Sequence, residues 1–408
     1  MTASHQLSER RWIIVGAAAL IMAISMGAIV NGMSAFVVPM QNAYGWLRAD
    51  ISLINVSGII GLALGGLVMG PLADRYGTRI LVVSGSIVLG LSYMGASQAS
   101  QLWQFYLLIF IAGFLGGAAI FSPVMAAVGN WFPVGAGLAI GIASAGQALG
   151  QGSVPFVSSI LIQRFGIEVT LAATGAIMLL ILVPLSLMLG PAPGAGSKST
   201  SSVPHSSGDG YPPFNMVVPT LSVAVILCCT CMSVPLMHLV PLIQDRGFEA
   251  GEASGVIFVM LLAGIVGRVA FGKFSDIVGA LPAYMTATFW MTLLVYGFIH
   301  VSSLTGFYAY AIVYGFGYAG VMTGVLVSVA CLTPPQRRAS AMGIVGFFGW
   351  LGHANGGFFG GYLFDQMGDY SVAYALAATA GALNLLIVAI LYFKIRGQGN
   401  RPLLTGAT

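Results

Sequence analysis

The sequence predicts an all-α polytopic membrane protein with twelve transmembrane helices in two six-helix pseudo-repeats, and three observations predict it. The first is composition: of 408 residues, 58% are hydrophobic and 6% are charged, whereas a soluble globular domain carries about 25% charged residues. The second is the recurrence of apolar runs of about 20 residues, the length that crosses a bilayer. The third is a set of matches between the two halves at one fixed offset. The net charge of +4 is small and scattered, so we expect no nucleic-acid partner.

The apolar runs give twelve candidate spans. The 56 glycines suit helices that approach each other closely in lipid. In order, the spans cover Trp12–Val38, Ile51–Gly70, Ile80–Ser97, Leu102–Val128, Ala136–Ile162, Val169–Gly190, Val217–Ile243, Ala253–Phe274, Pro282–Val301, Leu304–Leu332, Ala341–Phe364 and Ser371–Lys394.

Charge asymmetry predicts that both termini are cytoplasmic, because Lys and Arg then gather on the inner side as the positive-inside rule requires. The inner side receives Arg10, Arg11, Arg75, Arg79, Lys198, Lys273, Arg337, Arg338, Lys394, Arg396 and Arg401, and the outer side receives Arg48, Arg164 and Arg246. We therefore expect a multi-pass protein of a bacterial-type inner membrane. The first apolar run is too long for a signal-peptide core, so we expect it to be retained.

A Gly-, Pro- and Ser-rich stretch separates the two halves. Residues 191–213 contain few bulky apolar groups, which is typical of a flexible linker, so we predict six-helix bundles over residues 1–190 and 214–408. Parallel repeats of this kind build transporters with a central site, and both repeats in one chain suggest a functional monomer. The matches pair Gly70 with Gly272, Asp74 with Asp276, Gly77 with Gly279, Pro133 with Pro335, Gly141 with Gly343, Gly150 with Gly352, and Gly166 with Gly368.

The cysteines do not form a recognisable metal site. Cys228, Cys229 and Cys231 share one apolar stretch and Cys331 stands alone, without the spacing of a zinc site, so we interpret them as small packing residues. No phosphate-binding loop or nucleophile arrangement occurs in the sequence. We expect neither a metal, a cofactor nor an enzyme activity.

Arg268 is the one strongly charged side chain deep within a predicted span. A charge at that depth costs at least about 2.5–3.5 kcal/mol, so it usually faces a polar cavity on a substrate or ion path. A guanidinium keeps its charge, and its planar fork fits a carboxylate in bidentate fashion. We therefore expect Arg268 to bind an anion. The alternative is a packing arginine that extends to the cytoplasmic surface or pairs with Asp276, two turns away.

Two histidines are candidates for proton coupling. No Asp or Glu falls within a predicted span, whereas His238 lies in the seventh and His353 in the eleventh. Histidine titrates near about pH 6.5 and is a natural reversible proton carrier. The alternative is a neutral histidine that bonds to a neighbouring helix.

Other residues complete the predicted substrate site. Tyr314 and Tyr318 are one turn apart and share a helix face, so a phenol could orient a carboxylate, although both could simply pack. Amides inside apolar helices need partners, which a substrate or a neighbouring helix can supply. Phe121 could form an apolar wall or be an ordinary core aromatic. The amide candidates for substrate binding are Asn31, Gln147 and Asn355.

The segment Gly70–Arg79, between the second and third spans, combines tight-turn glycines with an acid and basic residues. It resembles the signature loop of the major facilitator superfamily, and the segment around Asp276 is a weaker copy. The resemblance implies a secondary transporter in which Asp74, Arg75, Arg79 and Asp276 serve gating. In this interpretation Asp74 pairs with cytoplasmic helix ends and basic groups, as a latch between states.

A second segment, Trp131–Gly150, resembles the fifth-helix entry of monocarboxylate transporters and the oxalate–formate antiporter group. The similar positions are Leu138, Ala139, Gly141, Ala143 and Gly146. His238 resembles a seventh-helix histidine of bacterial members. Arg268 matches the eighth-helix arginine that binds the substrate carboxylate in that family.

Two of the departures from the family pattern bear on the mechanism: one concerns the proton site and the other the charge of the substrate. Gly264 stands where animal carriers have an acid one turn before the arginine, which leaves the proton site unidentified. Gly349 stands where the oxalate–formate antiporter has an eleventh-helix lysine. One cation instead of two favours a monoanion over a dicarboxylate.

These residues lead us to expect symport of a small monocarboxylate, such as lactate or pyruvate, together with a proton. Two alternatives stay open. One is an organic-anion exchanger of the oxalate–formate type. The other is an exporter of hydrophobic compounds or drugs, which would tolerate the loss of Arg268.

Overall fold

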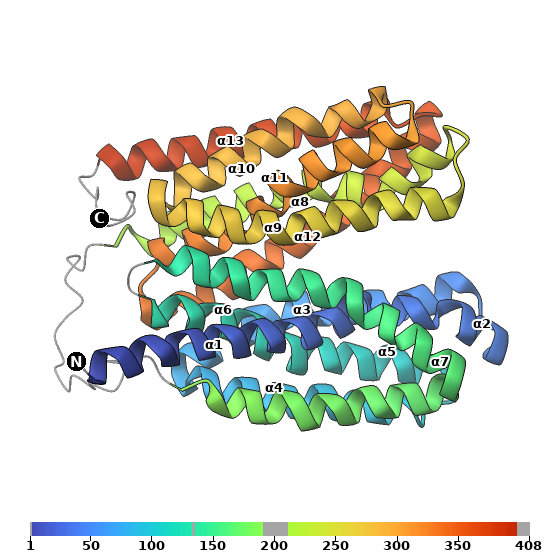
Figure 1. Ribbon diagram of the computed structural model, residues 1–408, viewed down its shortest axis with the longest axis horizontal. Coiled ribbons are helices and arrows are strands. Elements are labelled where there is room, and N and C mark those ends of the chain that lie inside the picture. Colours follow the sequence, from blue (N-terminus) through green and yellow to red (C-terminus); the bar gives the residue numbers. More distant parts are fainter. Residues whose placement is uncertain (1, 133–134, 191–210, 398–408) are drawn as a thin grey trace. The chain divides into compact units, whose positions relative to one another are not determined.

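Helices dominate the computed structural model, which describes residues 2–132, 135–190 and 211–397 (Figure 1). No strand occurs among these residues, so the predicted all-α class is confirmed. Residues 191–210 of the predicted linker, with Lys198, lie outside the described residues, as does Arg401.

The first six spans are built from α-helices interrupted by short π- and 3-10 turns. Their elements are α1 (Thr2–Met26), η1 (Gly27–Asn31), η2 (Gly32–Phe36), α2 (Val37–Tyr44), α3 (Arg48–Tyr76), α4 (Thr78–Ala96), α5 (Leu102–Ile111), η3 (Ala112–Gly117), α6 (Ala118–Trp131) and α7 (Ala136–Met188). The remaining spans are formed by α8 (Phe214–Gln244), α9 (Ala250–Val278), α10 (Ala280–Val295), η4 (Tyr296–His300), α11 (Leu304–Leu332), η5 (Pro335–Arg337), α12 (Arg338–Met367) and α13 (Ser371–Gly397).

Ten stretches of described helix are long and apolar enough to cross a membrane. One of them, α7, has 53 residues and breaks at Gly166, where φ is 80° and ψ is 177°. The chain reverses at this break (Figure 1), so α7 supplies two spans. α12 is not among the ten because glycines, His353 and Asn355 dilute its apolar character, yet its 30 residues are long enough to cross. The described chain therefore contains the twelve predicted spans.

The first span contains a π-helical turn, η1, whose widened backbone needs outside hydrogen-bond partners. The Tyr93 hydroxyl donates to the carbonyl of Ala28 at 2.8 Å. The Asn55 amide donates to the carbonyl of Val30 at 2.8 Å. In lipid a backbone carbonyl without a partner costs several kcal/mol, so α3 and α4 hold this irregular turn in place.

The backbone repeats as the sequence does. Gly77 and Gly279, which end α3 and α9, have φ values of 93° and 96°. Gly166 and Gly368, the next matched pair, have φ values of 80° and 76°. All four are in the region that favours glycine, so the matched glycines mark equivalent reversals in the two repeats.

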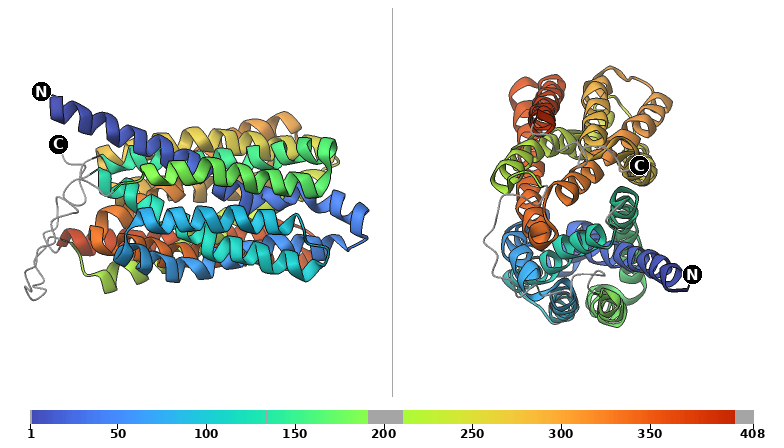
Figure 2. Two further views of the ribbon diagram at one scale, coloured as in Figure 1. Left: turned by 90° about the horizontal axis from the view of Figure 1, so that it is seen from below. Right: turned by 90° about the vertical axis from the view of Figure 1, so that its left-hand side faces the viewer.

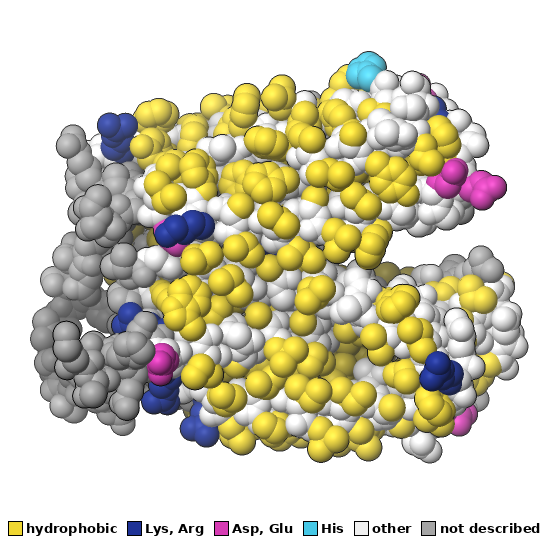
Figure 3. Space-filling model, in the orientation of Figure 1, with side chains coloured by type: hydrophobic (Ala, Val, Ile, Leu, Met, Phe, Trp, Pro, Cys, Tyr) yellow, Lys and Arg dark blue, Asp and Glu magenta, His cyan; other side chains and the backbone are white. Residues whose placement is uncertain are grey.

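The chain forms two compact units. The first comprises Met1–Phe132, Ile142–Ser202 and Pro335–Phe347, and the second comprises Pro133–Gly141, Val203–Pro334 and Phe348–Thr408. Within each unit the helices run alongside one another, which is clearest where they are seen nearly end-on (Figure 2). Apolar side chains cover the helices between their ends, and charged side chains gather near the ends (Figure 3). That pattern is expected of helix surfaces that face lipid.

Glycines set the spacing of helices in the first unit. A Cβ atom built at Gly113 would lie 2.0 Å from the carbonyl oxygen of Gly58, and one at Gly65 would lie 2.4 Å from that of Phe114. Such distances leave no room for a methyl group. Close backbone approach of this kind drives helix association in membranes.

We expect Gly113→Ala to destabilise the first unit by about 1–3 kcal/mol, because the added methyl group forces η3 away from α3. The measurement is the thermal unfolding midpoint of detergent-purified protein. Gly16→Ala is the matched control, since nothing lies within 4 Å of a Cβ there. Equal midpoints for the two variants would contradict this account of the packing.

Candidate functional site

Arg268 is positioned by a close contact between α9 and α11 in the second unit. A Cβ atom at Gly267 would lie 2.0 Å from the carbonyl oxygen of Phe316, and one at Gly315 would lie 2.2 Å from that of Met260. The two backbones therefore touch on both sides of the contact. Arg268 follows Gly267 directly in the sequence. The close packing of the two backbones at Gly267 therefore fixes the point from which the guanidinium side chain starts.

The start of α7 packs against the same stretch of α9. A Cβ atom at Gly141 would lie 2.7 Å from the carbonyl oxygen of Arg268, and one at Gly272 would lie 2.4 Å from that of Gly137. The backbone at Arg268 is thus held by neighbours on two helices.

Polar and aromatic side chains from α11 and α12 surround the guanidinium. Arg268 is only 8% exposed, and it interacts electrostatically with Tyr318 and with His353. The ring of Tyr314 lies 5.7 Å from that of Tyr318, centroid to centroid. Three helices therefore bring three of the predicted residues, Tyr314, Tyr318 and His353, together with a fourth, the buried cation Arg268.

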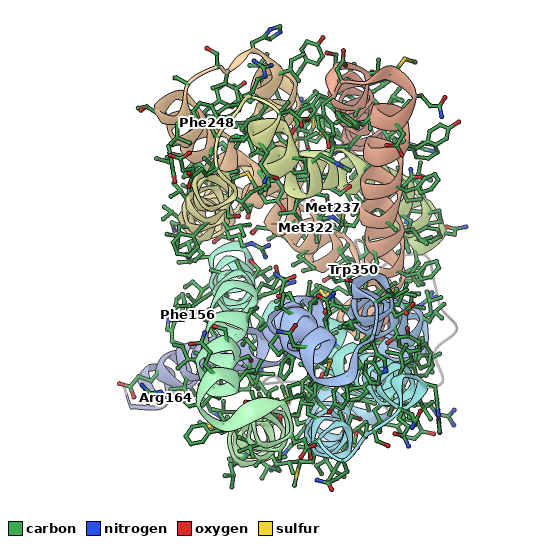
Figure 4. All side chains as sticks on the ribbon, turned by 90° about the vertical axis from the view of Figure 1, so that its right-hand side faces the viewer. Phe156, Arg164, Met237, Phe248, Met322 and Trp350 are labelled. Atoms are coloured by element: carbon green, nitrogen blue, oxygen red, sulfur yellow. The ribbon has the colours of Figure 1, made fainter. Side chains whose placement is uncertain are left out.

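Trp350 belongs to this group although the sequence analysis does not single it out. Its ring centroid lies 5.9 Å from that of His353, and it comes from α12 (labelled in Figure 4). The spacing of three residues places both side chains on one face of a helix. That spacing is the signal that could have identified Trp350.

Asp276 caps a helix in the second unit. Its two carboxylate oxygens accept hydrogen bonds from the backbone amides of Gly137 at 2.7 Å and Leu138 at 2.9 Å. An aspartate satisfies free amides at a helix start and stabilises its positive end. Asp276 thus serves the first turn of α7, which weakens the alternative that it exists to pair with Arg268.

Asp74 makes the same contact in the first unit. Its oxygens accept from the backbone amides of Ala339 at 3.1 Å and Ser340 at 2.8 Å, and from the Ser340 hydroxyl. These residues stand at the fixed offset from Gly137 and Leu138, just as Asp276 does from Asp74. The two repeats therefore carry one capping contact twice.

The basic residues predicted for gating differ in their surroundings. The Arg75 guanidinium lies 5.3 Å from the ring centroid of Tyr76, and Arg79 is exposed. Arg337, the last residue of η5, interacts electrostatically with Asp74. The charge partner of this aspartate is thus on η5.

His238 joins α8 to α12. Its Nε2 lies 2.9 Å from the carbonyl oxygen of Gly357, to which it donates. A Cβ at Gly360 would lie 2.4 Å from the imidazole, so glycine is required for this approach. The Tyr370 ring lies 5.5 Å away. His238 thus orients the helix that carries His353.

The amides predicted for substrate binding have protein neighbours. Asn355 donates to the Thr230 hydroxyl at a long 3.4 Å. Asn31 donates to the carbonyl of Gln151 at 3.1 Å, as expected of an interhelical bond. Asn31 and the buried Phe121 and Gln147 belong to the first unit, whereas Arg268 belongs to the second.

The two departures from the family pattern have steric surroundings that fit them. A Cβ atom at Gly264 would lie 3.0 Å from that of Ala319, so an acidic side chain would crowd α11. A Cβ at Gly349 would lie 3.7 Å from Cys229 Sγ and from a methyl group of Val225. Both distances are ordinary van der Waals contacts with α8.

Comparison with known proteins places these features in a family. The model of the Major Facilitator Superfamily matches residues 17–283 and 220–406. Monocarboxylate transporter 13 of Bos taurus is 28% identical over 405 residues, which cover 96% of this chain and 92% of that protein. The Fujikurins efflux protein of Gibberella fujikuroi is 28% identical over 286 residues, which cover 69% of this chain and 60% of that protein.

Among solved structures, the human organic anion transporter MFSD10 (TETRAN) matches with a TM-score of 0.74 at 15% identity. The match covers 93% of this chain and 99% of that one. At this identity the likeness concerns the fold alone.

The paired caps predict segment-specific effects. Losing a cap costs about 1 kcal/mol, so the amides it protected should exchange roughly fivefold faster. We expect Asp276→Ala to accelerate hydrogen exchange at Gly137 and Leu138, and Asp74→Ala to do so at Ala339 and Ser340. Hydrogen–deuterium exchange with peptide-level mass spectrometry measures both. If each variant affected both segments equally, the paired capping contacts would not be independent.

Proposed function

Because the chain belongs to the major facilitator superfamily, we propose that it is a secondary transporter of small monocarboxylates of the lactate or pyruvate type, in symport with protons. The family and the transporter relatives make the chain a transporter rather than an enzyme. The monocarboxylate transporter relative supports a small organic anion as the substrate. The choice of a monocarboxylate, and of the proton, rests on the residues of the second unit.

The observation that carries the proposal is the buried guanidinium of Arg268. It is a permanent charge in an apolar bundle, where a charged group is costly unless it is paired or hydrogen-bonded, so the position of this guanidinium suggests a function. A carboxylate docking on its fork would form two parallel charge-assisted hydrogen bonds. The phenol of Tyr318 lies within electrostatic range and could orient the same anion. Gly349 stands where the oxalate–formate antiporter has a lysine, and the absence of this second cation supports a monoanion.

His353 is the better placed of the two histidines for the coupled proton. It interacts electrostatically with Arg268, whereas His238 donates to a helix carbonyl. Two positive charges at short range in low dielectric repel strongly. A bound carboxylate would compensate Arg268 and so permit a proton on His353. Anion and proton then favour each other's binding, which is the requirement for symport.

Two other functions compete with this one. An exchanger of the oxalate–formate type needs to bind dianions, and the single central cation argues against it. An exporter of larger hydrophobic compounds is supported by the likeness to the Fujikurins efflux protein. Such an exporter would keep its activity when Arg268 is replaced.

The proposed setting is an inner membrane with both termini cytoplasmic. The exposed basic residues at the α3–α4 turn support this orientation under the positive-inside rule. Membrane lipid would contact the apolar outer faces, and the two repeats in one chain support a functional monomer.

We expect Arg268→Ala to abolish uptake of radiolabelled lactate into proteoliposomes under an inward proton gradient. Arg268→Lys keeps the charge but loses the fork, so we expect KM to rise about tenfold or more. Arg164→Ala, an exposed residue beside the break of α7 at Gly166, is the control and should transport normally. Normal lactate uptake by Arg268→Ala would show that Arg268 is structural and does not bind the substrate, and no lactate uptake by the wild type would refute the substrate class.

His353→Gln should separate anion binding from proton coupling. We expect the equilibrium affinity for lactate to stay within roughly threefold, because Gln preserves a polar group beside Arg268. Accumulation driven by a pH gradient should be lost, whereas flux down a lactate gradient continues. His300→Gln, in the short turn η4, is the control. Undiminished pH-driven accumulation in His353→Gln would exclude His353 as the coupling site.

A further inference from the structure

Four tyrosines of the second unit, Tyr370, Tyr374, Tyr314 and Tyr318, interact in succession, and we call them the column. The ring of Tyr370, beside the start of α13, lies 6.4 Å from that of Tyr374. Tyr374 interacts electrostatically with Tyr314 on α11, whose ring lies 5.7 Å from that of Tyr318. Tyr318 in turn reaches Arg268. The column thus runs from a helix end to the buried cation.

Phe298 packs against the two tyrosines in the middle of the column, Tyr314 and Tyr374. Its ring centroid lies 5.0 Å from that of Tyr314 and 6.3 Å from that of Tyr374. Both tyrosines are fully buried. Anything that links their hydroxyls is therefore enclosed by protein.

The hydroxyls of Tyr314 and Tyr374 have no hydrogen-bond partner among the described residues. A buried hydroxyl without a partner costs about 1–3 kcal/mol, and phenylalanine would fill the same space without that cost. Native proteins satisfy such groups with ordered water, which makes about three hydrogen bonds at a polar site. Two neighbouring hydroxyls of this kind therefore mark a place for enclosed water.

The ends of the column differ in charge. At the helix end, His238 lies beside Tyr370. Burial, with the Asp245 and Asp365 carboxylates, raises the pKa of Tyr370, which keeps its hydroxyl protonated. At the other end stand Arg268 and His353.

The groups that face the column between its ends are neutral. Cys231 and Tyr310 lie near Tyr314, and Cys229 lies near Tyr318. The helices packed around the column are α8, α9, α10, α11 and α13, and among them only α9 contains acids, Glu252 in its first turn and Asp276 near its other end. A proton moving along the column would therefore meet no carboxylate that could trap it.

We propose that Tyr370, Tyr374, Tyr314 and Tyr318, with enclosed water, conduct the symported proton between the His238 end of the second unit and His353. Each oxygen accepts a proton from one neighbour and releases its own to the next. No phenolate forms, and one proton enters as one arrives at the imidazole. The anion need not share this route, because its ligand is Arg268. The inference rests on the proposed proton symport and adds the path that the proton takes.

The test uses Tyr314→Phe and Tyr374→Phe in proteoliposomes containing a pH-sensitive dye. Removing one hydroxyl should slow pH-driven lactate uptake and the accompanying internal acidification by about tenfold or more. Equilibrium lactate binding at fixed pH should stay within roughly twofold, because the proton still reaches its site with time. The ratio of rates in H2O and D2O should rise as proton delivery becomes limiting.

Tyr310→Phe is the matched control, because Tyr310 is on the same helix and its hydroxyl donates to the Leu294 carbonyl. It should keep the wild-type rate and isotope effect. Wild-type rates in both column variants would overturn the path. A parallel loss of binding and rate would also overturn it, since the tyrosines would then be ligands. A wild type that moves lactate without acidification, or no lactate at all, would refute proton symport itself and the path with it.

Discussion

The burial of one permanent positive charge is the constraint on which the second unit depends. A guanidinium inside an apolar bundle is tolerated only where its surroundings are fixed and polar groups face it. Glycines at 264, 267 and 315 bring α9 against α11, and Gly141 brings the start of α7 against the Arg268 carbonyl. The charge is therefore held by backbone contacts that cannot easily relax. The same contacts deliver Tyr318 and, through α12, His353 to its vicinity.

The internal repeat explains how such a site arises on a symmetric frame. Gly66 in the first repeat occupies the position of Arg268 in the second at the same offset that relates Asp74 to Asp276. At both places a glycine of another helix approaches the backbone: Gly343 approaches the Gly66 carbonyl and Gly141 that of Arg268. The helix contact is thus kept in both repeats while the side chain differs. The helix packing is common to the two repeats, and the charged side chain occurs at a position where their residues differ.

Much of the fold could be predicted because lipid forces each backbone segment to satisfy its own hydrogen bonds, so apolar length alone locates helices. Two helices do not follow this rule, each for a local reason. Polar residues lower the mean hydropathy of α12, and Gly166 breaks α7 within an uninterrupted apolar stretch. The site was less predictable. Arg268 stands out as an isolated charge, but its approach to His353 depends on how α9 and α12 pack, which no sequence spacing reports. For Asn31 the sequence left two roles open, and its neighbours favour the interhelical bond.

The proposed symport of an anion and a proton has an electrostatic rationale. Without substrate, the charge on Arg268 opposes a second positive charge nearby, such as a proton on His353. A carboxylate removes that opposition locally, and a proton on His353 then leaves the group with one net positive charge, as before substrate arrived. Either ligand alone would change this charge by one unit. In the proposed symport the empty and the fully loaded site therefore carry the same net charge, whereas a site that holds only one ligand differs from both.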